Sequence, residues 1–285
     1  MIPSIPQPKT FRVAYGAYVA LFFLYLVVPL VVVAAFAFND SLFPSLPWNG
    51  FTLDWFINDR EPRLGLFHDG ALLRSIGVSA FVAVWVSVLS VGVGTCNAFL
   101  FEREAFPFRD FLYVLMLAPL VIPGVILGIS ILVFSNSIIN GVDALVGVEI
   151  DALRPGLLLV VLGQFAFLTT ITTLVISARL RKFDVSLEEA AANLGATRMT
   201  AIWTVTIPYL RPALAGAGIV AFLMSFENFN TTLMLVGSDA PLTITMYDRL
   251  REGSTPVLNA VSLLLMVASG ALGLISIFVQ RDRST

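Results

Sequence analysis

Long apolar runs, broken by short polar segments, set the pattern along this chain. A helix needs about 20 largely apolar residues to cross about 30 Å of hydrocarbon. Six runs reach that length: residues 13–38, 75–101, 111–134, 156–178, 213–237 and 257–280. Their apolar residues are continuous rather than alternating, which favours helices over the strands of a membrane barrel. The pattern predicts an all-α membrane protein with six transmembrane helices.

The amino-acid composition is also typical of a membrane protein. Hydrophobic residues make up 58% of the 285 residues and charged residues 13%, whereas soluble domains carry about 45–50% apolar and about 25% charged residues. The 17 lysines and arginines are matched by 19 acids and form no basic tract, which excludes nucleic acid as a partner, because phosphate binding needs clustered cations. No internal repeat divides the chain, so we expect a single domain over residues 1–285, with membrane lipid around it.

The loops on alternate sides of the predicted spans differ in positive charge. Eleven of the 17 lysines and arginines lie on the side of both termini and six on the other. Because lysine and arginine accumulate in cytoplasmic loops, both termini are predicted to be cytoplasmic. The first outer loop, residues 39–74, holds Trp48, Trp55 and Phe56 among turn residues, which indicates a short element at the membrane interface.

The cytoplasmic segment 179–212 contains a short helix with signals at both ends. Ser186 and Glu189 have the spacing of a capping box, which begins a helix. Gly195 can adopt the left-handed conformation that ends one. One small apolar stripe results, formed by Leu187, Ala190, Ala191 and Leu194. Such a stripe suits docking into a groove of another chain, and spacing alone equally allows a helix that lies on its own bundle or on the membrane surface.

The same segment carries a longer motif. Glu189-Ala190-Ala191, three residues, Gly195, nine residues and then Val205-Thr206-Ile207-Pro208 resemble the E-A-A-x3-G-x9-I-x-L-P signature of permease subunits of ATP-binding-cassette importers. The two departures, Val for Ile and Ile for Leu, keep apolar residues in place.

That resemblance implies a function for the short helix. In the family it is the cytoplasmic coupling helix between spans four and five, which docks on a separate ATPase subunit. The motif carries over onto Glu189, Ala190, Ala191 and Gly195, with Pro208 ending the following helix. The positions expected to couple to the ATPase are therefore Ser186, Leu187, Glu188, Glu189, Ala190, Ala191, Leu194, Gly195 and Pro208.

The resemblance also implies an assembly and a mechanism. The type I importer core would cover roughly residues 70–280. The chain would pair with a second, different permease subunit, two ATPase subunits and an extracytoplasmic solute-binding protein, in the inner membrane of a bacterium. Transport would proceed by alternating access.

Three further segments are similar to the spermidine/putrescine-type branch of these permeases. They are residues 118–125, residues 225–228 with Tyr247, and residues 254–256. The similarity implies a small polar solute, a polyamine first, and a pair of different permease chains. Another solute, such as an amino acid, a sugar or an inorganic ion, stays open as the alternative.

The chain lacks the residues for ATP hydrolysis. Its two lysines, Lys9 and Lys182, follow a proline and an arginine, so no glycine-lysine phosphate loop is present. No cofactor is therefore expected on this chain, and ATP with Mg²⁺ would be held by the partner ATPase. No catalytic residue and no metal ligand set is predicted either, which argues against an intramembrane enzyme.

Polar and proline residues inside the predicted spans are the candidates for the solute path. Glu227 is the one acid within a predicted span, and such residues usually face a bundle interior or a water-filled cavity. Asn230, three positions on, is expected to share its helix face, while Asn228 points elsewhere. The alternative is an interhelical hydrogen-bond cluster.

Two prolines and a polar group in the neighbouring spans leave further alternatives open. Pro119 and Pro123 are expected to kink or open the third span, as a hinge or as a fixed break. Gln164 and the threonines after it could line a cavity or bond neighbouring helices. A secondary transporter with Glu227 as its ion site is the competing function, disfavoured because no second proline-broken span is found.

Overall fold

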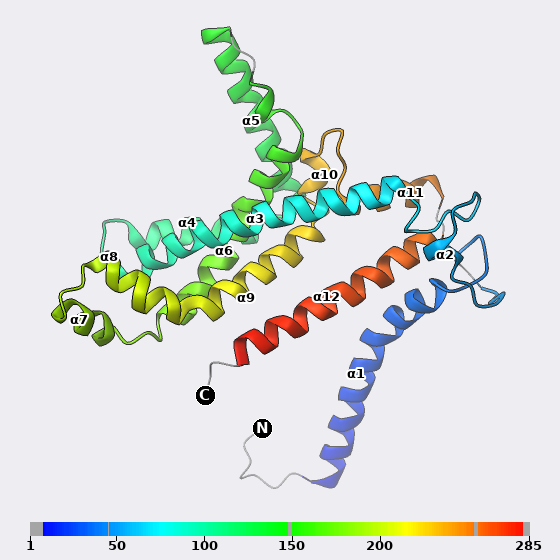
Figure 1. The fold of residues 1–285 in the computed structure, drawn as a ribbon, viewed down its shortest axis with the longest axis horizontal. Coiled ribbons are helices and arrows are strands. Elements are labelled where there is room, and N and C mark those ends of the chain that lie inside the picture. The colour runs from blue at the N-terminus through cyan, green and yellow to red at the C-terminus, as the bar shows by residue number, and fades with distance from the viewer. Residues whose placement is uncertain (1–7, 45, 148–149, 254–255, 282–285) are drawn as a thin grey trace. The chain divides into compact units, whose positions relative to one another are not determined.

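The computed structural model describes residues 8–44, 46–147, 150–253 and 256–281, with side chains as far as residue 274. The chain forms two compact units: Met1–Gly70 with Arg249–Val267, and Ala71–Asp248 with Ala268–Thr285. Helices dominate both units (Figure 1), and the strand-like pairing found within the described residues is an isolated bridge between Asn39 and Phe51. Of the sequence segment 254–256, Ser254 and Thr255 lie outside the described residues.

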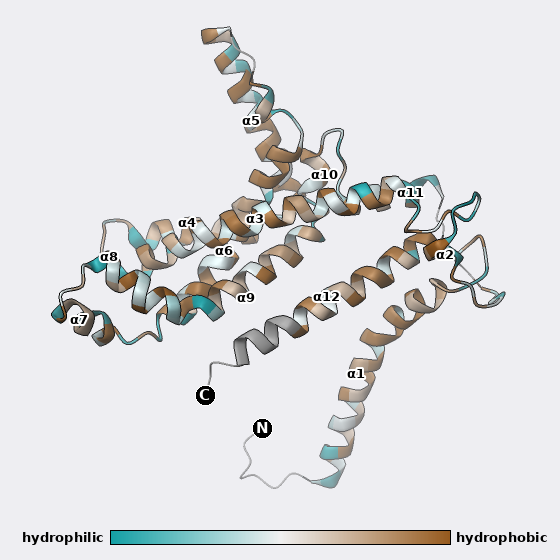
Figure 2. Cartoon of the chain, viewed as in Figure 1, coloured by the Kyte–Doolittle hydropathy of each residue, from teal (hydrophilic) through white to brown (hydrophobic). Residues whose placement is uncertain are grey.

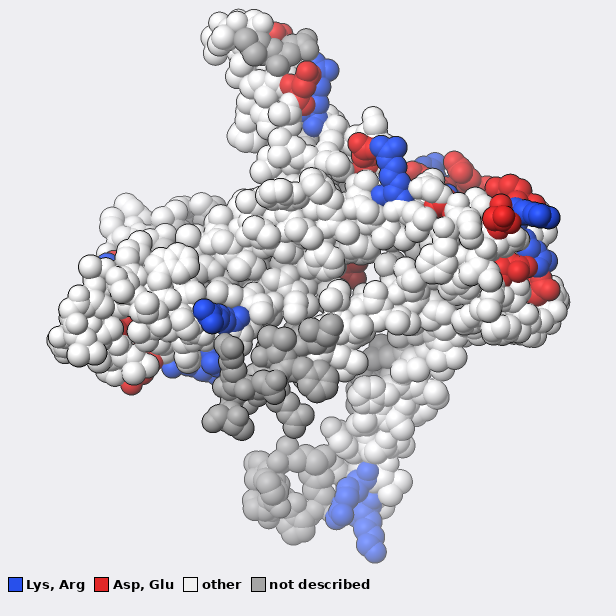
Figure 3. Space-filling view, viewed as in Figure 1, with Lys and Arg blue, Asp and Glu red and all other residues white. Residues whose placement is uncertain are grey.

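Six helices of the described part are long and apolar enough to cross a membrane. They include α1 (Lys9–Phe36), α3 (Gly70–Arg103), α5 (Gly124–Val146), α6 (Leu157–Leu180), α9 (Ile207–Phe226) and α12 (Val257–Arg281). Hydrophobic residues predominate along α1 and α5, and hydrophilic ones are frequent in the loops (Figure 2). Charged side chains likewise gather at loops and helix ends (Figure 3). The prediction of an all-α membrane protein with six spans is confirmed, and the sidedness of the termini stays a prediction.

The third predicted span is two helices rather than one. The helix α4 (Arg109–Val121) ends before Ile122, and α5 begins after Pro123. Both connecting residues are extended, with ψ of 128° at Ile122 and 134° at Pro123. A proline lacks the N–H that would continue the helix and pushes the preceding residue out of helical conformation. Pro123 therefore opens a gap between two helices, which is one of the two outcomes predicted, while Pro119 is accommodated inside α4.

The fifth span lies earlier in the chain than predicted. Helical structure runs from Arg198 to Phe226 through α8 (Arg198–Ala201), the π-turn η2 (Ile202–Thr206) and α9. The range 213–237 is therefore wrong at both ends. Residues after Phe226 leave the helix, and a separate short helix, α10 (Thr232–Leu235), follows. The Asn228 side chain bonds the Thr232 N–H at 3.3 Å, a local bond that competes with helix continuation.

Pro208 also departs from its prediction, because it does not end a helix. It lies in the first turn of α9, directly after the π-turn that the Ile207 N–H closes on the Ile202 carbonyl. A proline ring clashes with the carbonyl four residues before it in a regular α-helix. The wider π-turn accommodates the ring, so the helix passes through Pro208.

In the larger unit, α6 is the most buried of the six spans. One apolar cluster packs α6 against α3 and α10, and a second packs it against α3 and α9. Small residues bring the helices together: a Cβ on Gly94 of α3 would lie 2.4 Å from Thr172 Oγ1 of α6. Figure 1 shows α3, α4, α6 and α9 running beside one another, with α5 leaving this group beside α10.

The polar residues of α6 bond neighbouring helices. Thr172 donates to the Ser90 carbonyl of α3 and Thr170 to the Met116 carbonyl of α4, both at 2.7 Å. Gln164 donates to Thr232 Oγ1 at 2.8 Å and accepts a hydrogen bond from Ser225. These side chains are buried, so the structure supports interhelical bonding and not cavity lining for them.

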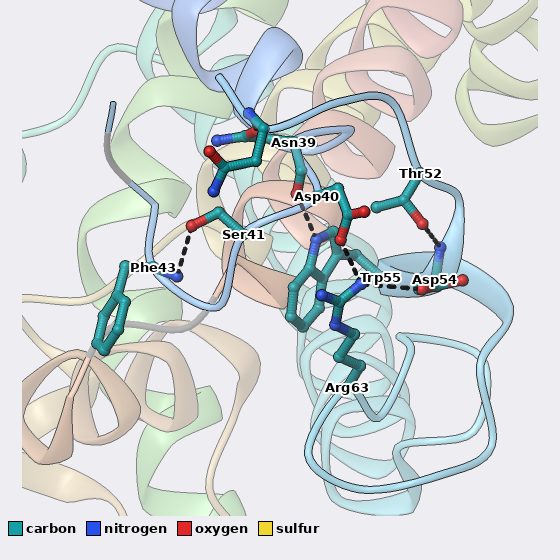
Figure 4. A network of polar contacts seen from close by, with 9 residues as sticks. Asn39, Asp40, Ser41, Phe43, Thr52, Asp54, Trp55 and Arg63 are labelled. Carbon is teal, nitrogen blue, oxygen red and sulfur yellow. Dashed lines mark hydrogen bonds and ion pairs between the residues drawn. The ribbon is translucent and has the colours of Figure 1, made fainter. Parts of the chain in front are cut away.

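The smaller unit contains the first outer loop, which folds around one buried tryptophan. The predicted short element is present as α2 (Asp54–Ile57). Trp55 is 2% exposed, and its indole N–H donates to the Asn39 carbonyl at 2.9 Å (Figure 4). Arg63 pairs with Asp40 and with Asp54 across the same loop. The loop is thus an ordered element held by internal bonds, and its depth in the membrane stays a prediction.

The remaining short elements connect the spans. They are η1 (Asp151–Leu153), α7 (Ser186–Asn193) and α11 (Leu242–Glu252). Within the smaller unit, Arg249 forms a bidentate pair with the buried Asp69, at 2.5 and 3.0 Å. This pair fixes the end of the outer loop to the last turn of α11.

Candidate functional site

The helix α7 has the predicted end but not the predicted beginning. Gly195 has φ of +91°, and the Ala196 N–H donates to the Ala191 carbonyl at 3.0 Å. This is the six-to-one bond of a Schellman motif, so the left-handed end at Gly195 is confirmed. The capping box is wrong: the Ser186 N–H bonds Asp184 Oδ1 at 3.0 Å, and no side chain caps the Val185 position.

Asp184 therefore takes the place that Ser186 was expected to have. Hydrogen bonds from the side chain and the backbone N–H of Ser186 hold the pKa of the Asp184 carboxyl below its ordinary value. These bonds stabilise the ionised carboxylate. The carboxylate lies beside the first turn of α7, where negative charge is favourable to the helix dipole.

The two faces of α7 differ. Leu187 and Leu194 are 50% and 90% exposed, and Ala190 between them is exposed too, as is Glu189. Glu188 and Ala191 are the half-buried positions and face the rest of the chain. Three of the four members of the predicted stripe thus point away from the chain's own bundle, which leaves an apolar face open for a partner or a membrane surface.

Glu188 points inward, which the sequence did not indicate. Its carboxylate accepts a hydrogen bond from Thr206 of the π-turn and lies 3.7 Å from Arg103 Nη2 at the end of α3. The two partners are far from Glu188 in sequence, so no local signal could have revealed the contact.

The pathway candidates sit in the turn between α9 and α10. Glu227 is the residue that caps the C-terminus of α9, and its side chain is exposed. Because the helix ends there, Glu227 and Asn230 do not share a helix face as predicted. Asn230 is also exposed, while Asn228 is half-buried and accepts a hydrogen bond from Thr232 Oγ1 at 3.0 Å. Asn228 therefore stabilises the turn, while the role of Glu227 and Asn230 in the solute path stays a prediction.

The two helix breaks meet each other. A Cβ on Gly124, directly after Pro123, would lie 3.1 Å from the Asn230 Cβ and 3.2 Å from Thr231 Oγ1. A Cβ on Gly128 would lie 3.0 Å from the Thr231 carbonyl oxygen. The hinge candidate and the polar turn are therefore in contact, although about a hundred residues separate them in sequence. Pro119 lies one turn earlier, inside α4.

An aromatic pair borders the polar turn. The rings of Phe229 and Tyr247, from the turn and from α11, have centroids 5.0 Å apart. Thr243 of α11 donates to the Asn228 carbonyl at 3.0 Å. An exposed carboxylate, an exposed amide and two aromatic rings thus lie close together at the turn between α9 and α10.

Comparisons with known proteins agree with this architecture. The chain is 28% identical over 256 residues to the putrescine transport system permease protein PotI of Escherichia coli, covering 89% of this chain and 86% of that protein. It is 24% identical over 274 residues to the spermidine/putrescine transport system permease protein PotC of the same organism, covering 96% of each.

Solved structures show the same fold. A chain of a bacterial ABC transporter that imports the acidic polysaccharide alginate superposes with a TM-score of 0.74 at 16% identity, over 97% of both chains. A second structure, of a bacterial alginate ABC transporter in complex with its alginate-bound periplasmic protein, gives a TM-score of 0.73.

The sequence matches the family described as binding-protein-dependent transport system inner membrane component, over residues 90–281. That range is more than half of the chain and contains α7, both helix breaks and the polar turn. Since six helices of its described part are also long and apolar enough to cross a membrane, the chain is a multi-pass protein of this family of inner-membrane transport permeases.

Proposed function

We propose that this chain lines the path of an ATP-driven importer for small organic cations of the polyamine type. The observation that carries the proposal is the exposed carboxylate of Glu227 at the C-terminus of α9. Among the described residues, no hydrogen bond or ion pair of this side chain is found. A carboxylate that no internal cation neutralises is available to a cationic solute.

The surroundings of Glu227 also suit a cation. The last carbonyls of a helix carry partial negative charge, which favours positive charge near its C-terminus. The Phe229 and Tyr247 rings lie beside the same turn, and aromatic faces attract ammonium groups. The relatives PotI and PotC are named for putrescine and spermidine, which are cations of this kind. The alginate transporter shares the fold at 16% identity, so the fold alone does not select the charge of the solute.

We propose that ATP is hydrolysed on separate ATPase subunits that dock on the open face of α7. Leu187, Ala190 and Leu194 form that face, and Glu189 is exposed beside it. ATP and Mg²⁺ would be bound by those subunits. The full complex would contain two ATPase subunits, a second and different permease chain, and an extracytoplasmic solute-binding protein that delivers the solute.

The contact of the two helix breaks offers a route for alternating access. The extended residues Ile122 and Pro123 let α5 change direction relative to α4. Because Gly124 packs directly on Asn230, a rotation of α5 would move the polar turn. Opening and closing of the path would then occur where the candidate cation site lies.

The test is solute uptake by the whole complex in liposomes. The Glu227→Gln variant removes the charge and keeps the shape, and Asp143→Asn, at an exposed position of α5, is the control. We expect Glu227→Gln to raise the half-saturating putrescine concentration about tenfold, which corresponds to about 1.4 kcal/mol, and the control to behave as wild type. Unchanged uptake by Glu227→Gln would refute the role of this carboxylate.

The partners are tested by purification of the chain from its native membrane in mild detergent. Mass spectrometry should find an ATPase with a phosphate loop and a second six-span protein, and the eluate should hydrolyse ATP in a vanadate-sensitive manner. A chain that returns alone and moves solute without ATP would favour the secondary transporter instead.

A further inference from the structure

Three consecutive charges stand where α3 ends: Glu102 and Arg103 are its last two residues, and Glu104 follows directly. Each pairs with a different part of the segment that contains α7. Glu102 pairs with Arg181 at 2.7 Å, just after α6. Arg103 pairs with Glu188 of α7 at 3.7 Å, and Glu104 pairs with Arg198 at the start of α8.

The geometry of the helix end explains this pattern. Consecutive residues of an α-helix point about 100° apart, and the Glu104 N–H still bonds the Leu100 carbonyl at 3.3 Å, so the three adjacent side chains leave the end of α3 in three directions. The three charges at this helix end run negative, positive, negative, and their partners, in the same order along the chain, run positive, negative, positive. The segment from Arg181 to Arg198 therefore wraps around the end of α3, and Figure 1 places α7 and α8 at that end.

The central pair is the best shielded from water. The Arg103 and Glu188 side chains are 16% and 22% exposed, whereas those of Arg198 and Glu104 are 75% and 47% exposed. Exposed pairs contribute little to stability because water and salt screen them. Shielding makes the Arg103–Glu188 attraction stronger and the loss of one partner more costly.

Two more contacts tie this pair to the bundle. The Arg103 guanidinium lies 5.4 Å from the centre of the Phe183 ring, in the turn after α6. Thr206, which is fully buried at the end of the π-turn, donates to the Glu188 carboxylate. Glu188 thus joins α7 to the end of α3 and to the beginning of α9.

From these contacts we infer that Arg103 is a positioning residue that makes α7 and α3 move as one body, so that displacement of α7 by the ATPase reaches the second span directly. The inference rests on the proposed function, since it assumes that α7 receives the motion of an ATPase. Motion of α7 would then reach the membrane helices in two ways. One is along the chain, through α6 and α9, and the other is the direct contact between Glu188 and Arg103. Of the residues expected to couple, Glu188 would then act on the permease side of α7.

The first experiment measures the distance between α7 and α3 in the assembled complex. Spin labels are placed after Cys96→Ser at Ala192, an exposed position of α7 outside the docking face, and at the exposed Val93 of α3. In the wild-type background we expect one distance, the same without nucleotide and with ATP and vanadate. With Arg103→Met we expect a broader distribution that shifts between the two states. A wild-type distance that changes with nucleotide would overturn the inference.

The second experiment measures solute imported per ATP hydrolysed. Arg103→Met should keep the ATPase bound and hydrolysing, but lower the solute imported per ATP at least several-fold. Arg103→Lys, which keeps the charge, should retain most of the coupling, and the exchange of charges in Arg103→Glu with Glu188→Arg should recover part of it. Arg198→Met is the control, because its screened pair should contribute little.

The outcomes separate the inference from the proposed function. Unchanged solute import per ATP in Arg103→Met overturns the inference. So does loss of the ATPase from the complex in both Arg103→Met and Arg103→Lys, since Arg103 would then only support folding of α7. If the wild-type complex itself shows no ATP-dependent uptake, the proposed function fails, and the spin-label distances still report whether α7 and α3 move together.

Discussion

Replacement of Gly94 by alanine tests the packing of α3 on α6 most directly. A Cβ at this position would lie 2.4 Å from Thr172 Oγ1 and 3.0 Å from the Thr173 backbone nitrogen. Rotation of the Thr172 side chain would relieve the first contact but not the second, because the second involves the backbone. The helices must therefore separate, and the Thr172 hydrogen bond to the Ser90 carbonyl is weakened.

The expected loss of stability follows from three opposing effects. Overpacking of a well-packed site costs about 1–3 kcal/mol, and the hydrogen bond contributes about 1 kcal/mol. Alanine gains about 1 kcal/mol over glycine in helix propensity. The net loss for Gly94→Ala is thus about 1–3 kcal/mol. Gly77, on the same helix, has no atom within 4 Å of its would-be Cβ, so Gly77→Ala should be neutral or stabilising by up to about 1 kcal/mol.

The assay is thermal unfolding of the purified chain in detergent, followed by size-exclusion chromatography with fluorescence detection. At about 2–4 °C per kcal/mol, Gly94→Ala should unfold at a temperature about 2–12 °C lower than wild type. Gly77→Ala should unfold at or slightly above the wild-type temperature. Equal unfolding temperatures for the two variants would refute the close approach of α3 and α6.

Two further predictions concern the ends of α7. Gly195→Ala places a side chain at φ of +91°, which costs about 1–2 kcal/mol, so hydrogen exchange at the end of α7 should speed up and ATPase capture should fall; unchanged exchange would contradict the left-handed cap. The pKa of Asp184 is lowered in the folded protein, so its stabilisation of α7 should be present above about pH 4, the unfolded value, and be lost as the pH falls through the folded pKa. Carboxyl carbon chemical shifts should show Asp184 titrating below its value in the urea-unfolded chain, and equal values would contradict the Asp184 hydrogen bonds.

The sequence determined which parts of this protein enter the membrane. Insertion depends on the local sum of apolar surface over about 20 residues, and that sum is visible without any tertiary contact. It predicted four of the six spans closely, and the two prolines predicted the opening between α4 and α5. The left-handed end of α7 at Gly195 was predictable for the same reason, because a helix cap forms among neighbours in sequence.

Local signals failed where two of them compete. Ser186 and Asp184 both offer an oxygen near the first turn of α7; the spacing of Ser186 and Glu189 predicts a cap at Ser186, but Asp184 makes the bond. Apolar residues on both sides of Glu227 suggested one continuous helix, although the Asn228 side chain bonds the turn and ends α9 early. Hydropathy does not register such bonds.

The tertiary structure alone decided which polar side chains meet. Arg103, Glu188 and Thr206 come from three separate helical elements, and Gly124 meets Asn230 across the two helix breaks. A contact between residues that are far apart in sequence depends on how the helices pack, and packing depends on the shape of every side chain between them. The sequence therefore determined the spans and the motif on α7, while the way α7 is held to α3 followed only from the assembled bundle.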